Sequence, residues 1–255
     1  RTTPLWSESL VYDLKTNQIK FITVQQPFEQ STKEYLYDEK LQLIHELSDD
    51  NIDSFAYDWL GNRTAYNEKA YYFNNLLQLV DDNNAYDTNG NLIRTNRNGH
   101  PINLRYDALD RLIELKSNNL TYKYVYDSFH RRLSKVCSKE DGTILYEKNY
   151  LYDGLNEIGA YEENSLAELR ILGEGLGGEV GAAIAMEIGQ NIYIPIHDHR
   201  GSVRCLVDLK TKEIIETISY NAFGEEFSEN PISPWRFSSK RLDEESGFIF
   251  FGKRY

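Results

Sequence analysis

Hydrophobic and polar residues alternate over short stretches of this chain, and a helical period is rare. Leu112–Lys116 and Thr121–Tyr126 alternate in this way, and turn-forming Gly, Asn and Asp residues stand between such stretches. Alternation of this kind indicates strands with one buried face. Ser31–Leu47 keeps the pattern of strands and turns, whereas Ser165–Arg170 could form a single helical turn. The pattern therefore predicts an all-β fold of short strands.

The dipeptide Tyr-Asp recurs along the first part of the chain and organises it. The pairs are Tyr12-Asp13, Tyr37-Asp38, Tyr57-Asp58, Tyr86-Asp87, Tyr106-Asp107, Tyr126-Asp127 and Tyr152-Asp153. Three of the intervals between them are 20 residues, and a weaker copy at 72–77 fills most of the longest interval. In the clearest copies two variable residues follow the pair, then Gly or a polar turn former, then Asn or Arg and an aliphatic residue. Self-similarity of this kind indicates a repeat array.

The repeat unit has the chemistry of a β-hairpin. Its tyrosine ends one strand, and its aspartate can accept a backbone N–H two residues further on and so start a turn. Gly, Asn or Asp at the next turn position tolerates the positive φ that tight hairpins need. About 20 residues suffice for two strands and two turns, because strands usually run about 5–6 residues. Successive hairpins laid side by side would form one long, twisted sheet.

From about Tyr161 the Tyr-Asp spacing stops and the texture of the sequence changes. Glycines gather between Gly173 and Gly189, and three distinctive blocks follow. The blocks are 199–204 (His-Arg-Gly-Ser-Val-Arg), 220–225 (Tyr-Asn-Ala-Phe-Gly-Glu) and 247–255 (Gly-Phe-Ile-Phe-Phe-Gly-Lys-Arg-Tyr). The sequence thus predicts two parts, a hairpin array over residues 1–160 and a further β region over residues 161–255.

The Tyr-Asp pairs followed by these blocks, in this order, resemble RHS proteins, which are similar to the C-component of bacterial insecticidal toxin complexes and to the YD shell of animal teneurins. The block residues that carry the likeness are His199, Gly201, Ser202, Arg204, Tyr220, Phe223, Gly224, Gly247, Gly252, Arg254 and Tyr255. In that family a strip of hairpins spirals into a hollow cocoon, and a variable C-terminal toxin lies inside it. The resemblance implies a long, curved, spiralling sheet that is part of such a cocoon.

The resemblance also implies a function. It predicts a non-catalytic segment of a shell that encapsulates and delivers a C-terminal toxin or effector polypeptide. The expected partners are the enclosed toxin and either the remaining shell segments of the same protein or a complementary chain. The expected location is secreted or cell-surface, reached by bacterial export, although no targeting signal is recognisable. Because open sheet edges attract other strands, a strip of this length also predicts self-association.

No enzyme activity is expected from the resemblance. In the family, an aspartyl self-cleavage segment continues past the Arg-Tyr position, which is Arg254-Tyr255 here. That segment would lie beyond Tyr255. Asp243 and Glu244 lie upstream of the family's cleaving carboxylates and match no catalytic position. We therefore expect no catalytic residue among these 255.

Composition favours a thin wall and argues against several other classes of protein. The chain has 19 tyrosines and one methionine, with a mean hydropathy of -0.59. Tyrosine suits a wall wetted on both sides, because its ring packs while its hydroxyl reaches water.

The net charge is -12, and nucleic acid is not an expected partner, because phosphate backbones reward basic patches. Arg131, Arg132 and Lys135 come nearest to such a patch and are interpreted as a solvated face. No apolar run is long enough to predict a membrane span.

Other residue clusters have structural explanations that we prefer. His197 and His199 would share one face of a strand and could bind zinc, but no third ligand is evident, so we expect neither metal nor cofactor. The acidic pairs are interpreted as solvated turns and not as glycosidase carboxylates. These pairs are Asp49-Asp50, Asp81-Asp82 and Glu225-Glu226. The glycines of 173–178 lack the Lys-Ser/Thr ending of a phosphate loop, and Cys137 and Cys205 leave a disulfide open.

An alternative function of a different class is a cell-surface adhesion or carbohydrate-binding module. In that hypothesis stacked tyrosines of the Tyr-Asp pairs would bind sugars. The hairpin spacing of the pairs favours the other interpretation, in which the tyrosine rings pack between adjacent strands.

Overall fold

The computed structural model describes residues 5–26, 29–49, 51–174, 182–226 and 231–252. Within these residues the regular structure is antiparallel β-sheet, apart from one short 3-10 helix, η2 (Phe237–Ser239). The prediction of an all-β fold built from repeated hairpins is confirmed. The chain divides into two compact units, Arg1–Asp82 and Asn83–Tyr255.

In the first unit, the described residues form a seven-stranded sheet whose strands lie side by side in chain order. The strands are β1 (Ser7–Tyr12), β2 (Ile19–Gln25), β3 (Gln30–Tyr37), β4 (Leu43–Leu47), β5 (Ile52–Tyr57), β6 (Arg63–Tyr66) and β7 (Lys69–Ala70). Few of its side chains are buried. They are the apolar Ile22, Tyr35 and Phe55 and the acidic Glu46 and Asp53.

In the second unit, the described residues form a 13-stranded sheet, again in chain order, and a separate two-stranded sheet. The strands of the large sheet are β8 (Ala85–Tyr86), β9 (Leu92–Arg97), β10 (His100–Tyr106), β11 (Leu112–Ser117), β12 (Leu120–Tyr126), β13 (Arg132–Lys139), β14 (Ile144–Asp153), β15 (Asn156–Glu162), β16 (Ser165–Leu172), β17 (Ala183–Ile188), β18 (Asn191–His197), β19 (Val203–Asp208) and β20 (Ile214–Thr217). The small sheet pairs β21 (Arg241–Asp243) with β22 (Phe248–Phe250).

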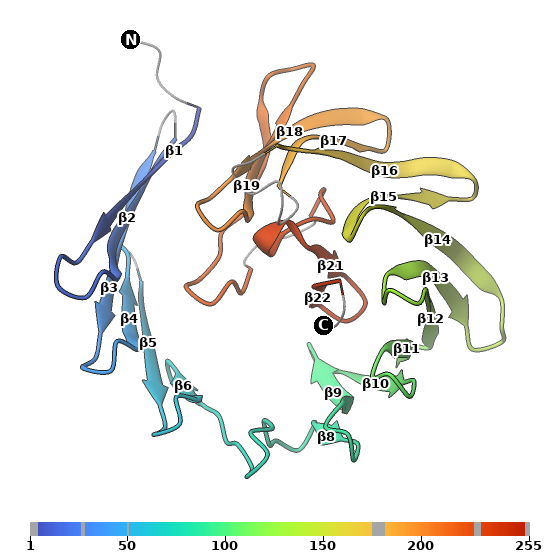
Figure 1. Ribbon diagram of the computed structural model, residues 1–255, viewed down its shortest axis with the longest axis horizontal. Helices are drawn as coiled ribbons and strands as arrows, with labels where there is room; N and C mark the ends of the chain where they lie inside the picture. Colours follow the sequence, from blue (N-terminus) through green and yellow to red (C-terminus); the bar gives the residue numbers. More distant parts are fainter. Residues whose placement is uncertain (1–4, 27–28, 50, 175–181, 227–230, 253–255) are drawn as a thin grey trace. The chain divides into compact units, whose positions relative to one another are not determined.

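The large sheet of the second unit is curved, and the C-terminal segment lies against its concave face (Figure 1). We call residues 231–252 the inner segment. Trp235 of this segment is fully buried in a cluster with Val203, Leu206 and Tyr220. Phe248 packs on a second cluster, formed by Ile102, Leu104, Leu112, Leu115 and Tyr124 of the sheet. The core of this unit therefore lies between the sheet and the inner segment.

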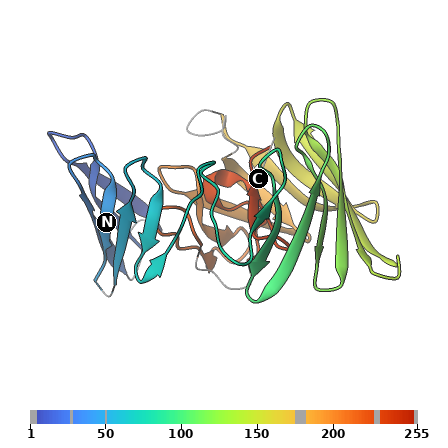
Figure 2. The same ribbon diagram turned by 90° about the horizontal axis from the view of Figure 1, so that it is seen from below.

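Hairpin loops of the second unit lie at the two ends of its strands, because successive strands run in opposite directions (Figure 2). At one end, which we call the Tyr-Asp edge, lie the loops at 87–91, 107–111, 127–131, 154–155 and 198–202. The opposite edge carries the loops at 98–99, 118–119, 140–143, 163–164, 189–190 and 209–213.

Strand pairing around β14, β15 and β16 bears on two of the sequence predictions. The sheet runs without interruption through β14, β15 and β16, so the change in sequence texture near residue 161 does not coincide with a break in strand pairing. The division at 160/161 therefore stays a prediction about the sequence motifs. Ser165–Arg170 belongs to strand β16, and the helical turn that the sequence allowed there is wrong. Tertiary pairing on both sides of β16 decides its conformation.

Candidate functional site

The aspartates of the Tyr-Asp pairs form the hairpin turns. After β10, Asp107 Oδ1 accepts the backbone N–H groups of Leu109 at 2.9 Å and of Arg111 at 3.0 Å. The backbone closes the same loop, since Asp107 N donates to Arg111 O and Asp110 N donates to Asp107 O. Asp110 takes a positive φ of 58°. The same pair of side-chain contacts recurs at Asp38, Asp58, Asp87 and Asp127.

Hydrogen bonds hold the turn carboxylates of Asp58 and Asp87 in the ionised form. The side-chain amide of Asn62 donates to Asp58, and that of Asn91 donates to Asp87. In each case this bond, together with backbone N–H groups, lowers the pKa of the aspartate. The acceptors of these two turns are therefore available at neutral pH.

Tyrosine hydroxyls connect several repeats to the one before. Tyr126 OH donates to Leu112 O at 2.8 Å, and Leu112 is the residue paired with Tyr106 of the preceding repeat. Tyr57 OH donates in the same way to Leu43 O, which is opposite Tyr37. The same type of bond is made by Tyr37 to Ile19, Tyr152 to Arg132 and Tyr220 to Val203. These contacts explain why the repeat specifies tyrosine and not phenylalanine.

Two of the Tyr-Asp pairs depart from the common turn. Asp13 accepts from Lys15 and Thr16, and its loop is one residue longer. Asp153 lies in the strand ladder opposite Asn156, so this hairpin closes with two residues, of which Gly154 has a φ of 57°. The dipeptide alone therefore does not fix the length of the turn.

Two of the blocks that suggested the RHS resemblance are further copies of the common turn. Asp198 Oδ1 accepts from Arg200 and Ser202, and Asn221 Oδ1 accepts from Phe223 and Glu225. Gly201 and Gly224 supply the positive φ, at 75° and 82°. The signal was present in the sequence, since each Asp or Asn is followed three residues later by Gly, as Asp58 is by Gly61. His199 lies in the first of these turns and Tyr220 precedes the second.

The remaining described block residues contact the inner segment or Tyr220, or lie near the end of the inner segment. Ser202 Oγ accepts the N–H of Ser238 at 3.0 Å, and the guanidinium of Arg204 lies 5.6 Å from the ring centre of Tyr220. Gly247 and Gly252 have φ values of 73° and 87°. Arg254 and Tyr255 lie outside the described residues, as do the glycines among 175–181 and Asp50.

His197 and His199 do not share a strand. Strand β18 ends at His197, and His199 lies in the following turn, so the alternation that would have put them on one face does not apply. His197 Nε2 is buried and has no hydrogen-bond partner among the described residues. Burial, with a contribution from Arg170, lowers the pKa of His197 to about 4. In the described part of the chain, no group of three His, Cys, Asp or Glu side chains could hold a metal ion, and both cysteines are free.

A buried ion pair ties the sheet to the inner segment. Arg132 and Asp243 are both fully buried, and two nitrogens of the guanidinium contact the two carboxylate oxygens, one of them at 3.0 Å. The expectation that Arg131, Arg132 and Lys135 form a solvated face is wrong for Arg132 and Lys135, because the inner segment covers them. A charged side chain is rarely buried without a partner, and the partner here is 111 residues away. Strand periodicity cannot reveal such a partner.

Lys135 extends the same polar contact. Its Nζ lies 3.1 Å from both carboxylate oxygens of Glu245. Tyr124 OH donates to Glu245 Oε1 at 2.8 Å. Burial would lower the pKa of Lys135, but Glu245 and Asp243 more than offset that effect and raise it. Lys135 is therefore a charged anchor for the hairpin of β21 and β22.

A second set of buried charges surrounds Arg241 of the inner segment. Its Nε and Nη2 donate to the Glu157 carboxylate at 2.7 and 2.6 Å, and Nη2 also contacts Glu168. Lys148 of β14 pairs with Glu168 of β16, across the intervening strand β15. Burial alone would raise the pKa of Glu168, but Arg241 and Lys148 reverse this and lower it to about 2. These carboxylates are thus engaged in holding guanidinium and ammonium groups.

Aromatic rings separate the buried guanidinium groups. Arg132 and Arg241 lie 4.6 and 5.1 Å from the ring centre of Tyr150. Arg241 and Arg170 lie 5.3 and 4.8 Å from the ring of Trp235. Cation–π contacts of this kind are strongest where water is excluded. They form a continuous column of alternating cations and rings between the sheet and the inner segment.

A third anchor overturns part of the interpretation of the acidic pairs. Arg236 of the inner segment is fully buried and donates to Glu216 Oε1 at 2.6 Å and to Glu226 Oε2 at 2.9 Å. Glu226 was expected to lie in a solvated turn, but it binds this buried cation. The inner segment is therefore held by Arg236, Arg241 and Asp243, whose partners lie on the sheet or beside it.

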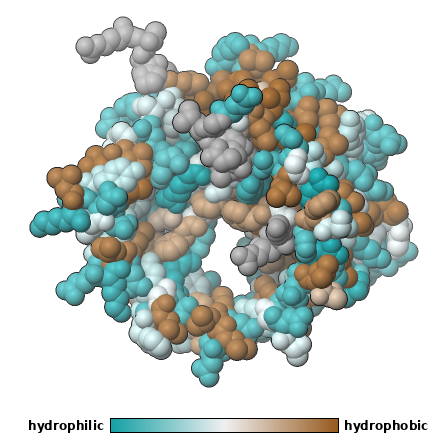
Figure 3. Space-filling model, in the orientation of Figure 1, coloured by the Kyte–Doolittle hydropathy of each residue, from teal (hydrophilic) through white to brown (hydrophobic). Residues whose placement is uncertain are grey.

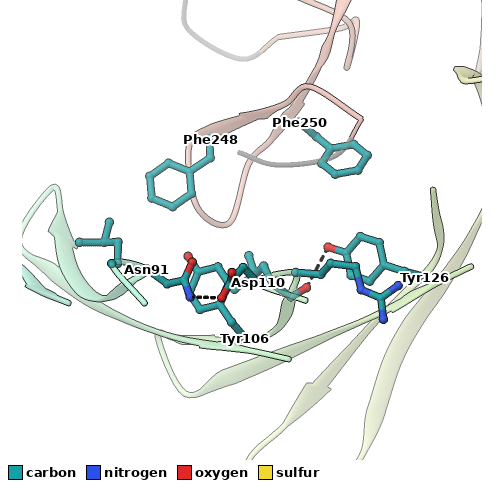
Figure 4. A pocket seen from close by; sticks show the side chains of 10 residues that line it. Asn91, Tyr106, Asp110, Tyr126, Phe248 and Phe250 are labelled. Carbon is teal, nitrogen blue, oxygen red and sulfur yellow. Dashed lines mark hydrogen bonds between the residues drawn. The ribbon is translucent and has the colours of Figure 1, made fainter. Parts of the chain in front are cut away.

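A pocket of about 360 Å³ lies between the inner segment and the sheet (Figure 4). Phe248 and Phe250 form one wall, and Tyr106 and Tyr126 face them from the sheet. The polar rim consists of Asn91, Asp110 and Arg111. Burial, with a smaller effect of Asp87, raises the pKa of Tyr106 to about 12. The groups of this rim bind one another, since Asn91 Nδ2 donates to Asp110 Oδ1 at 2.8 Å.

The family model described as Teneurin YD-shell matches residues 2–255. The chain belongs to the teneurin YD-shell family. Among curated relatives of this YD shell are the tRNA3(Ser)-specific nuclease WapA of Bacillus spizizenii and the tRNA nuclease WapA of Bacillus subtilis. Each is 24% identical over 236 residues, which covers 84% of this chain and 10% of the relative. The chain therefore spans about a tenth of the length of these relatives.

Solved structures share the fold. A structure of the Photorhabdus luminescens Tc holotoxin pore with a TccC3 mutation matches with a TM-score of 0.57 and 15% identity, over 98% of this chain and 16% of that chain. The crystal structure of TcdB2-TccC3-TEV matches with a TM-score of 0.57 and 14% identity, over 97% of this chain and 16% of that chain. At such identities the likeness shows the fold alone. No helix among the described residues is long and apolar enough to cross a membrane.

Proposed function

We propose that this chain is a non-catalytic segment of a YD shell that encloses a toxin or effector polypeptide and takes part in its delivery. The observation that carries this proposal is the inner segment. A stretch of chain that does not belong to the large sheet lies against the concave face, held by buried ion pairs such as Arg132–Asp243 and Arg241–Glu157. The concave face is therefore able to hold polypeptide that the sheet itself does not contain.

The chemistry of this face suits the role. Its contacts to the inner segment combine charged side chains with aromatic rings, and the carboxylates are paired with cations. Carboxylates held in this way are not available as general acids or bases at neutral pH. Membership of a shell family supports the same function. The proposed partners are further shell segments, or a complementary chain, and the enclosed polypeptide. The proposed location is outside the producing cell.

Native mass spectrometry of the protein as isolated from its source tests enclosure. We expect an assembly heavier than 29.7 kDa that contains an effector polypeptide, and limited proteolysis should spare that polypeptide until the shell is unfolded. An isolated, folded chain that carries no other polypeptide and binds glycans saturably would contradict enclosure and support the adhesion alternative. An effector that is digested as fast in the assembly as on its own would also contradict it.

A further inference from the structure

Two successive repeats of the second unit place a cation against the tyrosine ring of the repeat that follows. Arg111, four residues after Asp107, pairs with that aspartate and lies 5.3 Å from the ring centre of Tyr126. Arg131 pairs with the aspartate of its own turn in the same way and lies 5.4 Å from the ring centre of Tyr152. In these repeats a guanidinium therefore fills the space between a turn carboxylate and the next tyrosine ring.

The repeat before them lacks this cation. Asn91 stands in the corresponding position of the turn at Asp87, and its short, neutral amide donates to Asp87 Oδ2 at 3.0 Å. The next tyrosine is Tyr106, and in the described part of the chain no cation lies over its ring. The pocket of about 360 Å³ is found here, with Gly90, Asn91 and Tyr106 in its lining. The pocket therefore occupies the place where the neighbouring repeats hold a guanidinium.

The walls of this pocket suit a cation. Phe248 and Phe250 face Tyr106 and Tyr126 across it (Figure 4). A cation is attracted to the face of an aromatic ring when it lies within about 6 Å of the ring centre. The chain already uses this contact beside the pocket, because the guanidinium of Arg132 lies 4.6 Å from the ring centre of Phe250.

The charge of the pocket favours a cation as well. Asp110 on its rim accepts hydrogen bonds from the neutral amides of Asn89 and Asn91, at 3.0 and 2.8 Å. Among the described residues neither Asp110 nor Asp87 forms an ion pair. Arg111 also lines the pocket, but it is paired within its own turn. Two carboxylates without a counter-ion thus attract a positively charged group.

The shape of the pocket and its place in the fold indicate which cation it takes. A guanidinium is planar, so it can stack on rings while its edge donates to carboxylates, whereas an ammonium is a compact point charge. On the face seen in Figure 3, hydrophobic side chains stand in separate groups among hydrophilic ones. A partner on such a face meets small clusters and not one broad apolar surface. The pocket itself lies beside the inner segment, which is polypeptide held by similar contacts of rings and charges.

We propose that this pocket binds an arginine side chain of the polypeptide that the shell encloses. The source of the arginine rests on the function proposed above, whereas binding of the guanidinium rests on the pocket alone. The arginine would supply from another polypeptide the cation that Asn91 does not provide.

Titration of this chain with N-acetyl-arginine amide tests the pocket. Nuclear magnetic resonance would follow the backbone N–H groups of Gly90 and Asp110, which lie in the turns beside it. We expect saturable binding with a dissociation constant on the order of 1 mM, given the small size of the probe. N-acetyl-citrulline amide has nearly the same shape without the charge and should bind about tenfold more weakly. Equal binding of both probes, no response to arginine, or binding of a neutral saccharide at these residues in its place would each overturn the proposal.

Three variants assign the binding to these residues. Asn91→Arg introduces the residue of the neighbouring repeats, so its own guanidinium should cover Tyr106 and abolish binding. Asn62→Arg is the matched control in the first unit, because Asn62 makes the same bond to Asp58, and it should bind the probe as the wild type does. Asp110→Asn keeps the side-chain acceptor at a φ of 58° that asparagine tolerates, and should weaken binding about fivefold. Circular dichroism verifies folding, and undiminished binding by folded Asn91→Arg would contradict the proposal.

A photoreactive leucine analogue at position 92, which lines the pocket, identifies the occupant in the intact assembly. The cross-linked peptide should come from the effector and contain arginine. A peptide without arginine, or one from the shell itself, would overturn the assignment of the occupant. Enclosure is measured separately by protease protection of the effector. A chain that binds capped arginine but encloses no effector would therefore refute enclosure alone, and an enclosed effector with no response to arginine would refute the pocket alone.

Discussion

The two units of this chain are built from the same hairpin, yet only the second one has an extensive core. In the first unit, Asp58 and Tyr57 make the turn bond and the hydroxyl bond of the repeat, as Asp127 and Tyr126 do in the second. The first sheet buries Ile22, Tyr35 and Phe55, whereas the second buries two clusters and several charged groups. The difference arises from the inner segment. A Tyr-Asp wall thus becomes thick only where another stretch of polypeptide covers its concave face.

The largest expected effect comes from leaving a buried charge without its partner. Arg132→Met should destabilise the second unit by about 3–5 kcal/mol, because Asp243 would stay buried without its bidentate partner, and the nearest remaining cation, Lys135 Nζ, lies 3.8 Å away. Arg131→Met is the matched control, since its side chain is 30% exposed and exposed pairs contribute about 0–1 kcal/mol. Urea unfolding measures the loss of stability in each variant, and hydrogen exchange shows in which unit the loss occurs. If Arg132→Met and Arg131→Met lower the stability equally, or if the first unit loses as much as the second, the inner segment is not the source of the difference.

A smaller effect is expected from one glycine that the inner segment constrains. A Cβ on Gly224 would lie 2.4 Å from the ring of Phe237, at a φ of 82°, so Gly224→Ala should cost about 2–3 kcal/mol. Gly61→Ala in the first unit is the control, because its nearest neighbour is the flexible Gln42 amide at 3.4 Å. It should cost about 1 kcal/mol, which is the strain of the positive φ alone. Thermal unfolding of the two variants compares them, and equal losses would argue against the packing of Phe237 on this turn.

The stability of the second unit should also depend on pH through His197. Its pKa falls from 6.5 to about 4 on folding because of burial, so the unfolded chain binds the proton more readily. The contribution of His197 to the free energy of unfolding is therefore fully present above pH 6.5. It is lost as the pH falls toward 4, which lowers the free energy of unfolding by about 2–3 kcal/mol. His197→Gln should remove this slope. Urea unfolding at a series of pH values measures it, and an unchanged slope in the variant would assign the effect to other groups.

The smallest expected effect is the same in both units. Tyr126→Phe and Tyr57→Phe each remove one hydroxyl bond between repeats, to Leu112 O and Leu43 O, and should cost about 0.5–1.5 kcal/mol. Val125→Ala, on an exposed strand position, serves as a control for general strand perturbation. Chemical unfolding with separate reporters in the two units gives the values. A much larger loss in one unit would mean that the repeat does not contribute equally to both.

Much of the local structure could be predicted from the sequence. The Tyr-Asp spacing predicted hairpins, and the turns at Asp58, Asp87, Asp107 and Asp127 have the expected acceptor geometry. The errors occurred where a short pattern allowed two conformations, as at Ser165–Arg170, or where a charged side chain was assigned to a solvated position, as at Arg132, Lys135 and Glu226. The turns at Asp198 and Asn221 could also have been recognised as copies of the repeat, from the Gly three residues later.

The sequence by itself determined the all-β class, the hairpin period and the tyrosine ladder, because these depend on residues close together in the chain and on alternation between two faces. Only the tertiary structure decided which charges are buried. Arg132 and Asp243 are separated by 111 residues, and nothing in the neighbourhood of either one reveals that the curvature of the sheet brings the inner segment against it. Burial of a charge depends on what covers it, and in this chain the cover comes from a distant part of the sequence.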